Sequence, residues 1–328
     1  MSRNPIIPFS FCCLLVLAAA CFNSRLTISV LEPALVTLPA SIQGVSIFPL
    51  PGTMSPSGQF DSLSHVRLGE NVNIREIKLG YLHGMYDILS SSPRFKKVVI
   101  SDTACVRYIS QGYLYWDDVS RICAKDTTDV LLILQKAVSY DAVDNMNLYL
   151  NDDSDFTYYK IVNKTKWVFY MPETQTELAA FTNSDTVAAE GSFSPSELEN
   201  VLYQLCYATG YNMGKSLCPH WNDDVVRKFY SGPGTDMKTA ATMIMRDKWY
   251  DAALIWNRIA EGKNIMLASR AALNLALAFE RDDDLDQAIL WAAYADSLRS
   301  NSITTTYRKT LGERLKIKEN LDGQLSGY

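Results

Sequence analysis

The last third of the chain repeats apolar residues every three or four positions, which is the spacing of one face of an α-helix. From Thr235 onward only short polar turns interrupt this pattern, so it predicts a run of helices. A last amphipathic helix is indicated by four apolar residues at a spacing of four: Ile303, Tyr307, Leu311 and Leu315. The basic residues around them are typical of a solvated helix that ends a helical array. The pattern therefore predicts an all-α domain over residues 235–328.

The N-terminal half instead contains short runs rich in β-branched and aromatic residues, which favour strands. The run Thr128–Leu134 is apolar without alternation, as expected for a central strand that helices cover on both sides. A helix face recurs from Val72 to Leu89, and a short helix is predicted at Trp116–Ala124. Further strands are predicted at Leu26–Leu31, Val45–Leu50, Phe95–Ser101, Asn147–Leu150, Phe156–Val162, Lys166–Met171 and Thr176–Phe181. This order predicts an α/β or α+β domain over residues 21–190, with a mixed sheet that ends in antiparallel additions.

Two connecting helices are predicted over residues 191–234. The sequence Ser194-Pro195-Ser196-Glu197 is a well-formed helix start, with a capping serine, a proline in the first turn and a capping-box glutamate. We expect Gly210 to close this helix. A shorter helix is expected at Asp223–Tyr230, before Gly232-Pro233-Gly234, which we interpret as the boundary of the helical domain.

Residues 1–20 have the features of an export signal. They contain one basic residue, an apolar run from Phe9 to Leu17, and three alanines directly before Cys21. This resembles a bacterial lipoprotein signal, in which the cysteine thiol receives a diacylglyceryl group before cleavage. The resemblance implies that the mature chain begins at Cys21 and is anchored to a membrane by its acyl chains. An ordinary signal peptide cut after Ala20, or an uncleaved anchor, is the alternative.

The stretch 274–298 resembles a tetratricopeptide (TPR) repeat, which is a pair of antiparallel helices. Six residues fall on its signature positions: Leu275, Ala276 and Phe279 in the first helix, and Ala288, Ala292 and Ala295 in the second. Alanine at such contacts lets two helices approach closely, while larger side chains fill the space between repeats. Trp249–Ala253 matches Leu285–Ile289, which predicts a second, less regular unit. Because stacked repeats present a concave binding face, the resemblance implies a protein partner.

Pro219, Trp221, Arg227 and Tyr230 come close to a Pro-x-Trp…Arg-x-x-Tyr segment, placed before the predicted repeats. Together with an N-terminal α/β domain and TPR helices, this segment is similar to a family of uncharacterised Bacteroidota lipoproteins. The similarity implies a location in the cell envelope and no particular activity, because the family is defined by a domain of unknown function. No acidic export tag follows Cys21, which favours the periplasmic side of the outer membrane.

Composition and motifs exclude several classes of function. A formal net charge of −5 provides no electrostatic footprint for nucleic acid. The three histidines, His65, His83 and His220, lie far apart and form no metal-binding pair. No nucleophile motif occurs in the sequence. We therefore expect no catalytic residue, no cofactor and no metal.

Four cysteines besides Cys21 remain after the predicted cleavage: Cys105, Cys123, Cys206 and Cys218. An even number of cysteines in an oxidising envelope permits two disulfides, and the nearest pairs are Cys105 with Cys123 and Cys206 with Cys218. Free buried thiols fit the sequence equally well.

The sequence thus predicts a non-catalytic, lipid-anchored envelope protein whose TPR-like helices bind a protein partner. The large aromatic residues of the helices are interpreted as core rather than peptide contacts: Trp249, Trp256, Phe279 and Trp291. The alternative is a glycan-binding or hydrolytic protein whose cleft lies in the α/β domain. In that case, sugar would stack on aromatic residues of the sheet region: Trp116, Tyr158, Tyr159, Trp167 and Tyr170. Aromatic residues at strand positions usually pack within the sheet, which favours the first interpretation.

Overall fold

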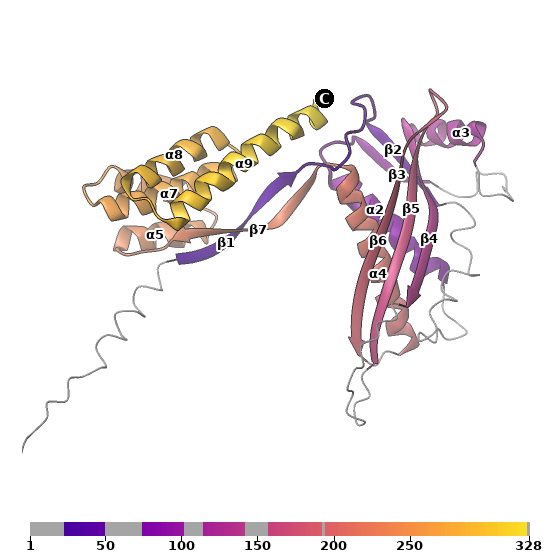
Figure 1. Cartoon of the computed structure of the whole chain (residues 1–328), viewed down its shortest axis with the longest axis horizontal. Helices are drawn as coiled ribbons and strands as arrows, with labels where there is room; N and C mark the ends of the chain where they lie inside the picture. Colours follow the sequence, from indigo (N-terminus) through magenta and orange to yellow (C-terminus); the bar gives the residue numbers. More distant parts are fainter. Residues whose placement is uncertain (1–22, 50–73, 102–113, 142–156, 192–193, 327–328) are drawn as a thin grey trace, which may run out of the picture. The chain divides into compact units, whose positions relative to one another are not determined.

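The computed structural model of the chain describes residues 23–49, 74–101, 114–141, 157–191 and 194–326 (Figure 1). These residues form two compact units. The sheet unit contains the described residues between Pro33 and His220 and those from Asp322 onward. The helical unit contains the described residues up to Glu32 and those from Trp221 to Leu321.

The sheet unit is built around one mixed sheet of five strands in the order β3-β2-β4-β5-β6. Strand β2 is parallel to both β3 and β4, whereas β5 is antiparallel to both of its neighbours, β4 and β6. Its elements are β2 (Gly44–Pro49), α2 (Ile74–Ser91), β3 (Lys97–Ile100), α3 (Trp116–Asp126), β4 (Val130–Asp141), β5 (Thr157–Met171), β6 (Thr176–Gly191) and α4 (Pro195–Leu217). The predicted mixed sheet with antiparallel additions is confirmed, although β5 is one long strand where two were expected.

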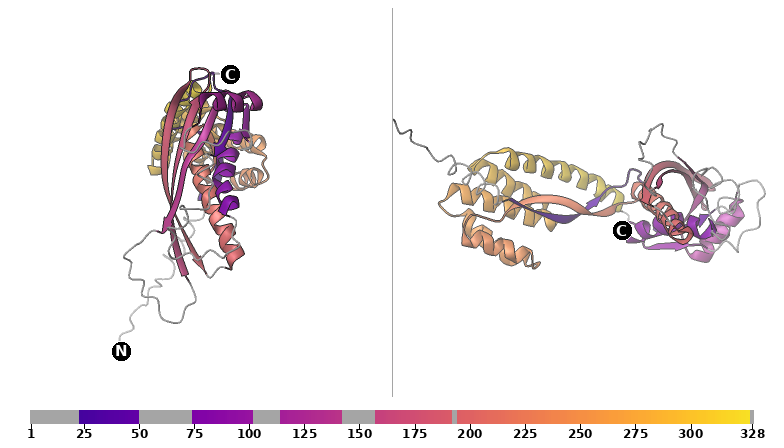
Figure 2. Two further views of the ribbon diagram at one scale, coloured as in Figure 1. Left: turned by 90° about the vertical axis from the view of Figure 1, so that its right-hand side faces the viewer. Right: turned by 90° about the horizontal axis from the view of Figure 1, so that it is seen from below.

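Helices cover both faces of this sheet. Leu131 and Ile133 of β4 point toward α3, whereas Leu132 and Leu134 point toward α2 and α4, and all four are buried. The sheet curls around α4 in an arc, which is clearest in the right-hand view of Figure 2. Burial on both faces explains why the central strand carries no polar alternation, as the sequence predicted.

Helices α2 and α4 pack unusually closely, through glycines that face the opposite helix. A methyl group at Gly80 or Gly84 would lie closer than 3.0 Å to backbone atoms of α4, and one at Gly210 would meet the backbone of Tyr81. The prediction that Gly210 closes α4 is therefore wrong, because the helix continues to Leu217. Gly210 lies inside the helix because only a residue without a side chain fits where α2 and α4 approach closely. From the neighbouring residues alone, such a glycine cannot be distinguished from one that ends a helix. The start of α4 is confirmed, since Ser194 and Glu197 form the predicted capping box.

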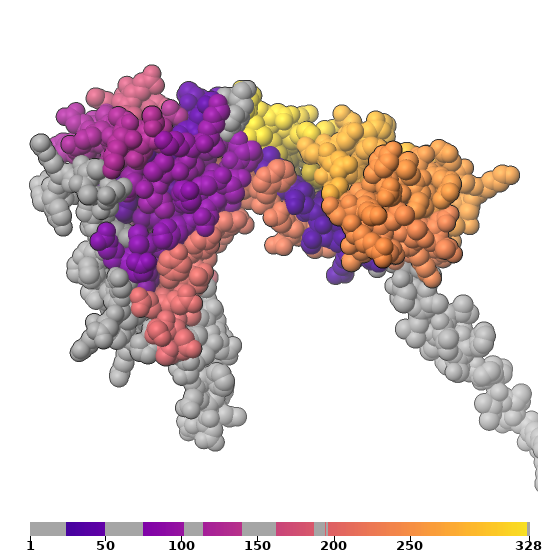
Figure 3. All heavy atoms as spheres, turned by 180° about the vertical axis from the view of Figure 1, so that it is seen from behind, coloured from indigo at the N-terminus to yellow at the C-terminus, as the bar shows by residue number. Residues whose placement is uncertain are grey.

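The helical unit contains five consecutive helices and a two-stranded sheet formed by the chain segments that flank the sheet unit. The elements are β1 (Asn23–Glu32), β7 (His220–Tyr230), α5 (Thr235–Ile244), α6 (Trp249–Ala260), α7 (Ile265–Arg281), α8 (Leu285–Leu298) and α9 (Ser302–Leu325). In the space-filling view, side chains of these helices form one continuous mass (Figure 3, orange to yellow). The predicted all-α C-terminal half is confirmed from Thr235 onward. Within the described residues, no helix is both long and apolar enough to span a bilayer.

The helix predicted at Asp223–Tyr230 is wrong, because these residues belong to strand β7. Alternate residues of this strand, Val225, Arg227 and Phe229, are less exposed than their neighbours, which is the period of a strand. Its partner β1 lies almost two hundred residues earlier in the chain. Only this long-range pairing makes β7 a strand. The boundaries of the two compact units therefore differ from those of the predicted domains. Strand β1 belongs to the helical unit, and helix α4 belongs to the sheet unit.

Alanines line the contacts between the helices. Ala276 of α7 packs with Ala288 and Ala292 of α8 and with Leu311 of α9, and all four side chains are fully buried. Ala295 belongs to the larger core cluster of the helical unit, which also contains Ala252, Ala260 and Ala271. These small side chains let α7 lie close to both α6 and α8, which is why almost every residue of α7 from Ala268 to Ala278 is buried.

Candidate protein-interaction surface

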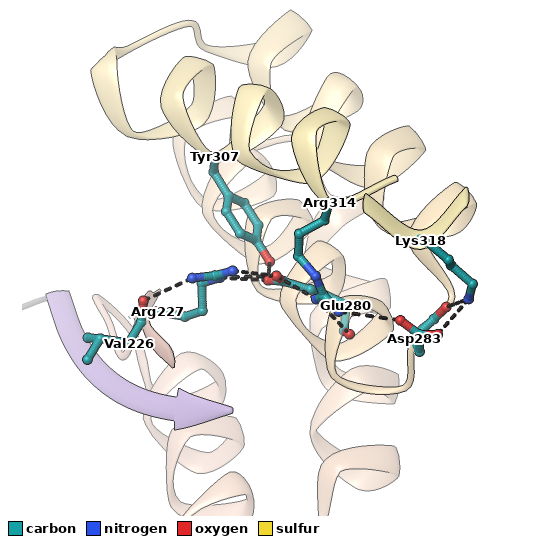
Figure 4. A network of polar contacts seen from close by, with 7 residues as sticks. All are labelled: Val226, Arg227, Glu280, Asp283, Tyr307, Arg314 and Lys318. Atoms are coloured by element: carbon teal, nitrogen blue, oxygen red, sulfur yellow. Dashed lines mark hydrogen bonds and ion pairs between the residues drawn. The ribbon is translucent and has the colours of Figure 1, made fainter. Parts of the chain in front are cut away.

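A buried carboxylate joins strand β7 to helices α7 and α9. Glu280 lies near the end of α7, and its side chain is completely inaccessible to solvent. It accepts hydrogen bonds from Arg227 Nε at 2.9 Å and Arg227 Nη2 at 2.7 Å, and from Arg314 Nη1 at 2.7 Å. The hydroxyl of Tyr307 donates a further bond of 2.5 Å (Figure 4). One carboxylate thus binds side chains from both β7 and α9. We call the four residues of this cluster the Glu280 network: Arg227, Glu280, Tyr307 and Arg314.

The partners of Glu280 more than offset the cost of burying its charge. Burial alone would raise the pKa of Glu280, but hydrogen bonds and charge from Arg227, with Tyr307 and Arg314, hold the pKa below its ordinary value. Burial and the neighbouring carboxylate raise the pKa of Tyr307 well above its ordinary value, so the phenol stays a donor. The Glu280 network is therefore a charged cluster at neutral pH, with two cations around one anion.

The network continues toward solvent through Asp283 in the turn after α7. Arg314 Nη2 lies 3.3 Å from Asp283 Oδ1, and Lys318 Nζ lies 2.5 Å from Asp283 Oδ2 (Figure 4). Asp283 therefore neutralises part of the charge of Arg314, and its contact with Lys318 attaches α9 to the turn that follows α7. Because Asp283 is well exposed, its two ion pairs contribute less to stability than those of buried Glu280.

A second contact fixes the end of β7 on α7. The Asn274 side chain accepts from the backbone N–H of Tyr230 and donates to its carbonyl oxygen, both at 2.8 Å. The Asn274 amide thus satisfies the backbone N–H and carbonyl of Tyr230, as a neighbouring strand would do. The guanidinium of Arg270 lies 5.0 Å from the centre of the Tyr230 ring. Arg227 and Tyr230, half of the segment singled out in the sequence, thus attach β7 to the helices.

A groove lies beside these fixed contacts, between β7, α7 and α9; we call it the β7 groove. Its volume is about 320 Å³, and two members of the Glu280 network, Arg227 and Tyr307, form part of its wall. The remaining lining is mixed: Val226, Lys228, Leu273, Ser302, Ile303, Thr306 and Thr310. Val226 is 54% exposed although it is apolar. The β7 groove therefore offers apolar contacts, hydroxyl groups and one exposed lysine on a wall held rigid by buried bonds.

An apolar depression of about 370 Å³ lies between the end of α6 and helix α8. Its exposed hydrophobic side chains are Leu290 and Tyr294, and the hydroxyl of Tyr294 donates to the carbonyl of Ala260 at 3.4 Å. Trp291 and Gln287 also line it. Apolar side chains exposed on neighbouring helices are typical of surfaces that contact other proteins.

The residues of the predicted TPR signature form contacts between helices and do not line either depression. Leu275, Ala276, Ala288, Ala292 and Ala295 are buried, and Phe279 packs against the cluster around Leu311. The helix tryptophans also pack in or against the core, as we expected: Trp249, Trp256 and Trp291. Trp291 also lines the depression between α6 and α8.

The aromatic residues proposed to stack on sugar are mostly core residues. Trp167 and Tyr170 are buried, and Trp116 packs against the cluster between α3 and the sheet. The side chains of Tyr158 and Tyr159 lie outside the described residues. No exposed aromatic platform is therefore formed by the described members of this set.

Three of the cysteines are free, buried thiols: Cys123, Cys206 and Cys218. The pairing of Cys206 with Cys218 is not formed, and burial raises the pKa of each of these two thiols to about 12. Because Cys123 is free, its predicted bridge to Cys105 is not formed either. Cys21 lies outside the described residues, so its acylation stays a prediction. Among the described side chains, no group of histidine, cysteine or carboxylate residues could hold a metal ion.

The Glu280 network was missed by sequence reasoning. A glutamate directly after the apolar run of α7 is a weak signal, because it equally suits a solvated helix end. Its partner Arg227 is distant in sequence and was interpreted as part of a helix. The role of Glu280 becomes visible only when β7 and α9 are placed on either side of α7.

The chain thus combines a mixed-sheet unit with a unit of packed helices. It belongs to the family described as "Domain of unknown function (DUF8603)", whose model matches residues 56–230. A second family, "Domain of unknown function (DUF6340)", matches residues 238–313. The first match thus ends at the last residue of β7, and the second lies within the helices from α5 to α9.

No curated protein matches the chain. Among solved structures, it is similar to a Helicobacter pylori protein described as a neuraminyllactose-binding hemagglutinin homolog. The two are 9% identical, and the match covers 57% of this chain and 91% of that one with a TM-score of 0.29. So low a score carries no argument about the fold or function of this chain.

Proposed function

We propose that this chain is a non-catalytic, lipid-anchored protein of the bacterial cell envelope whose TPR-like helices bind an extended segment of a protein partner. The observation that carries the proposal is the β7 groove, whose wall is fixed by the Glu280 network and by Asn274. A preformed wall lowers the ordering cost of binding, so a short segment can gain affinity from few contacts. The buried alanine contacts between α7 and α8 support the TPR-like interpretation.

The lining of the β7 groove favours an extended peptide over a folded surface. Leu273 and Ile303 provide apolar contacts, and the hydroxyls of Ser302, Thr306 and Thr310 can bond to peptide backbone groups. A volume of about 320 Å³ accommodates a few side chains and is too small for a docked domain. Because Arg227 is already paired with Glu280, its charge selects no ligand, whereas exposed Lys228 favours an acidic residue near one end.

Site-specific photo-crosslinking tests this proposal on the full-length, membrane-bound chain. A photoreactive amino acid at Thr306, in the groove, should yield one discrete cross-linked protein. The matched control is Thr242, an exposed helix threonine of α5 that lies outside the lining. Adding Val226→Glu should reduce the Thr306 product severalfold, because it places a charge on the exposed apolar lining. Equal products at both positions, or none at Thr306, would contradict the proposed groove.

The lipid anchor is tested by a separate substitution. Cys21→Ser removes the thiol that would be acylated, so the chain should move from the membrane fraction to the soluble envelope fraction. Immunoblotting of fractionated cells measures this shift, with Cys123→Ser as the control that leaves fractionation unchanged. Continued membrane association of the Cys21 variant would refute anchoring through that residue.

A further inference from the structure

Three lysines lie together on the face of the sheet opposite to α2 and α4. Lys164 and Lys166 alternate with the buried Asn163 and Thr165 along β5, so both point to that face. Lys136 of β4 is the cross-strand partner of Lys166. On the other side of β5, Thr182 pairs with Lys166 and Ser184 pairs with Lys164. These residues line a groove of about 490 Å³, together with Val138, Thr165 and Asn183; we call it the lysine groove.

An irregularity in β4 places Lys136 on this face. The pairing of β4 with β5 shifts between Leu134 and Lys136, which leaves Gln135 as an extra residue. Leu134 points into the core, so regular alternation would also turn Lys136 into the core. The bulge reverses this orientation and sets Lys136 directly across from Lys166. Bulges often re-aim a side chain in this way beside functional sites.

The resulting arrangement is unfavourable without a ligand. Two like charges directly opposite on antiparallel strands repel each other. Neither Lys136 nor Lys166 forms an ion pair with any carboxylate of the described residues. Asp185 of β6 lies in the row of Asn163, on the other face, where it accepts a bond from Asn212. Packing alone does not require this pair of charges, whereas an anion between them would relieve the repulsion.

We propose that the lysine groove binds a small molecule that carries two or more phosphate groups. Lysine ammonium groups bind phosphate as point charges, and the hydroxyls of Thr182 and Ser184 add neutral donors beside them. The described lining contains no aromatic side chain, which disfavours a neutral sugar held by stacking. The volume lies within the range of small-molecule sites. This site is independent of the β7 groove, which belongs to the other unit.

Calorimetric titration of the full chain with pyrophosphate tests the proposal. Pyrophosphate should bind, and Lys136→Glu/Lys166→Glu should weaken binding roughly tenfold or more, because two attractions become repulsions. The control Lys238→Glu/Lys263→Glu changes the net charge equally at two exposed positions of the helical unit outside the groove, and it should bind like the unaltered chain. The mild variant Lys136→Thr should also weaken binding without lowering Tm, since it removes one of two repelling charges.

Three outcomes would overturn the proposal. Pyrophosphate fails to bind the unaltered chain, both double variants bind it equally, or Lys136→Thr binds it unchanged. A parallel flotation assay with phosphatidylglycerol vesicles distinguishes the source of the phosphate groups. Lysine-dependent binding to vesicles without any binding of pyrophosphate would show a membrane-contact face instead of a small-molecule site.

Discussion

Replacing Glu280 with alanine should lower the free energy of unfolding of the helical unit by about 3–5 kcal/mol. The reason is the environment that remains: Arg227 and Arg314 would face each other across a buried space, and the Tyr307 hydroxyl would lose its acceptor. Removing one partner of a buried ion pair leaves the other charge buried without compensation, which lowers stability far more than replacing both partners by apolar residues. Hydrogen exchange of peptides from α7 and β7, measured by mass spectrometry on the full chain, reports the loss locally.

The matched control is Glu313→Ala. Glu313 also lies on a helix of the same unit, but its side chain is 61% exposed and its partner Lys309 is four residues away. Its replacement should cost less than about 0.5 kcal/mol. If Glu280→Ala and Glu313→Ala destabilised the unit equally, the Glu280 network would have no special structural role.

Acid should remove the contribution of Glu280 selectively. Its pKa is lower in the folded chain than in the unfolded one, so the unfolded state takes up a proton first as pH falls. The stabilisation is fully present above the ordinary glutamate pKa of about 4.3 and is lost as pH falls through the lower folded value. The difference in stability between the unaltered chain and Glu280→Gln should therefore be constant near neutrality and shrink below about pH 4.3. A pH-independent difference would contradict this assignment.

The second large effect is expected at the contact between α2 and α4. Gly84→Ala and Gly210→Ala should each destabilise the sheet unit by about 3 kcal/mol or more. In both cases the added methyl meets backbone atoms of the facing helix, which cannot rotate away as a side chain could. Urea unfolding of the full chain, with hydrogen exchange to assign the loss to the sheet unit, measures the effect.

Gly312→Ala is the opposite control. Gly312 lies within α9, and nothing stands within 4 Å of the position that its methyl group would occupy. Alanine there should stabilise the chain by about 0.5–1 kcal/mol, because it restricts the unfolded state and favours the helix. The same chemical change thus has opposite signs at Gly84 and Gly312. A stabilisation of similar size at both would show that helix propensity, and not close packing, governs these glycines.

Features that depend on neighbouring residues were predictable from the sequence. The continuous apolar run of β4 indicated a central strand, and Ser194 with Glu197 indicated the start of α4. The period of α7, α8 and α9 indicated packed helices with alanine at their contacts. In each case the signal lies within a few residues, because hydrogen bonding in helices and alternation in strands are local.

Tertiary structure decided what depends on distant partners. Residues 223–230 are a strand because β1 pairs with them, and Gly210 lies inside a helix because α2 crosses it. Glu280 is a buried anion because β7 and α9 bring arginines to it, and Lys136 joins Lys166 through a bulge. None of these partners lies near in sequence, so no local pattern could reveal them. Local sequence determined the helices and the strands of the mixed sheet, whereas strand β7 and the surfaces that we propose for binding arise from how distant segments pack.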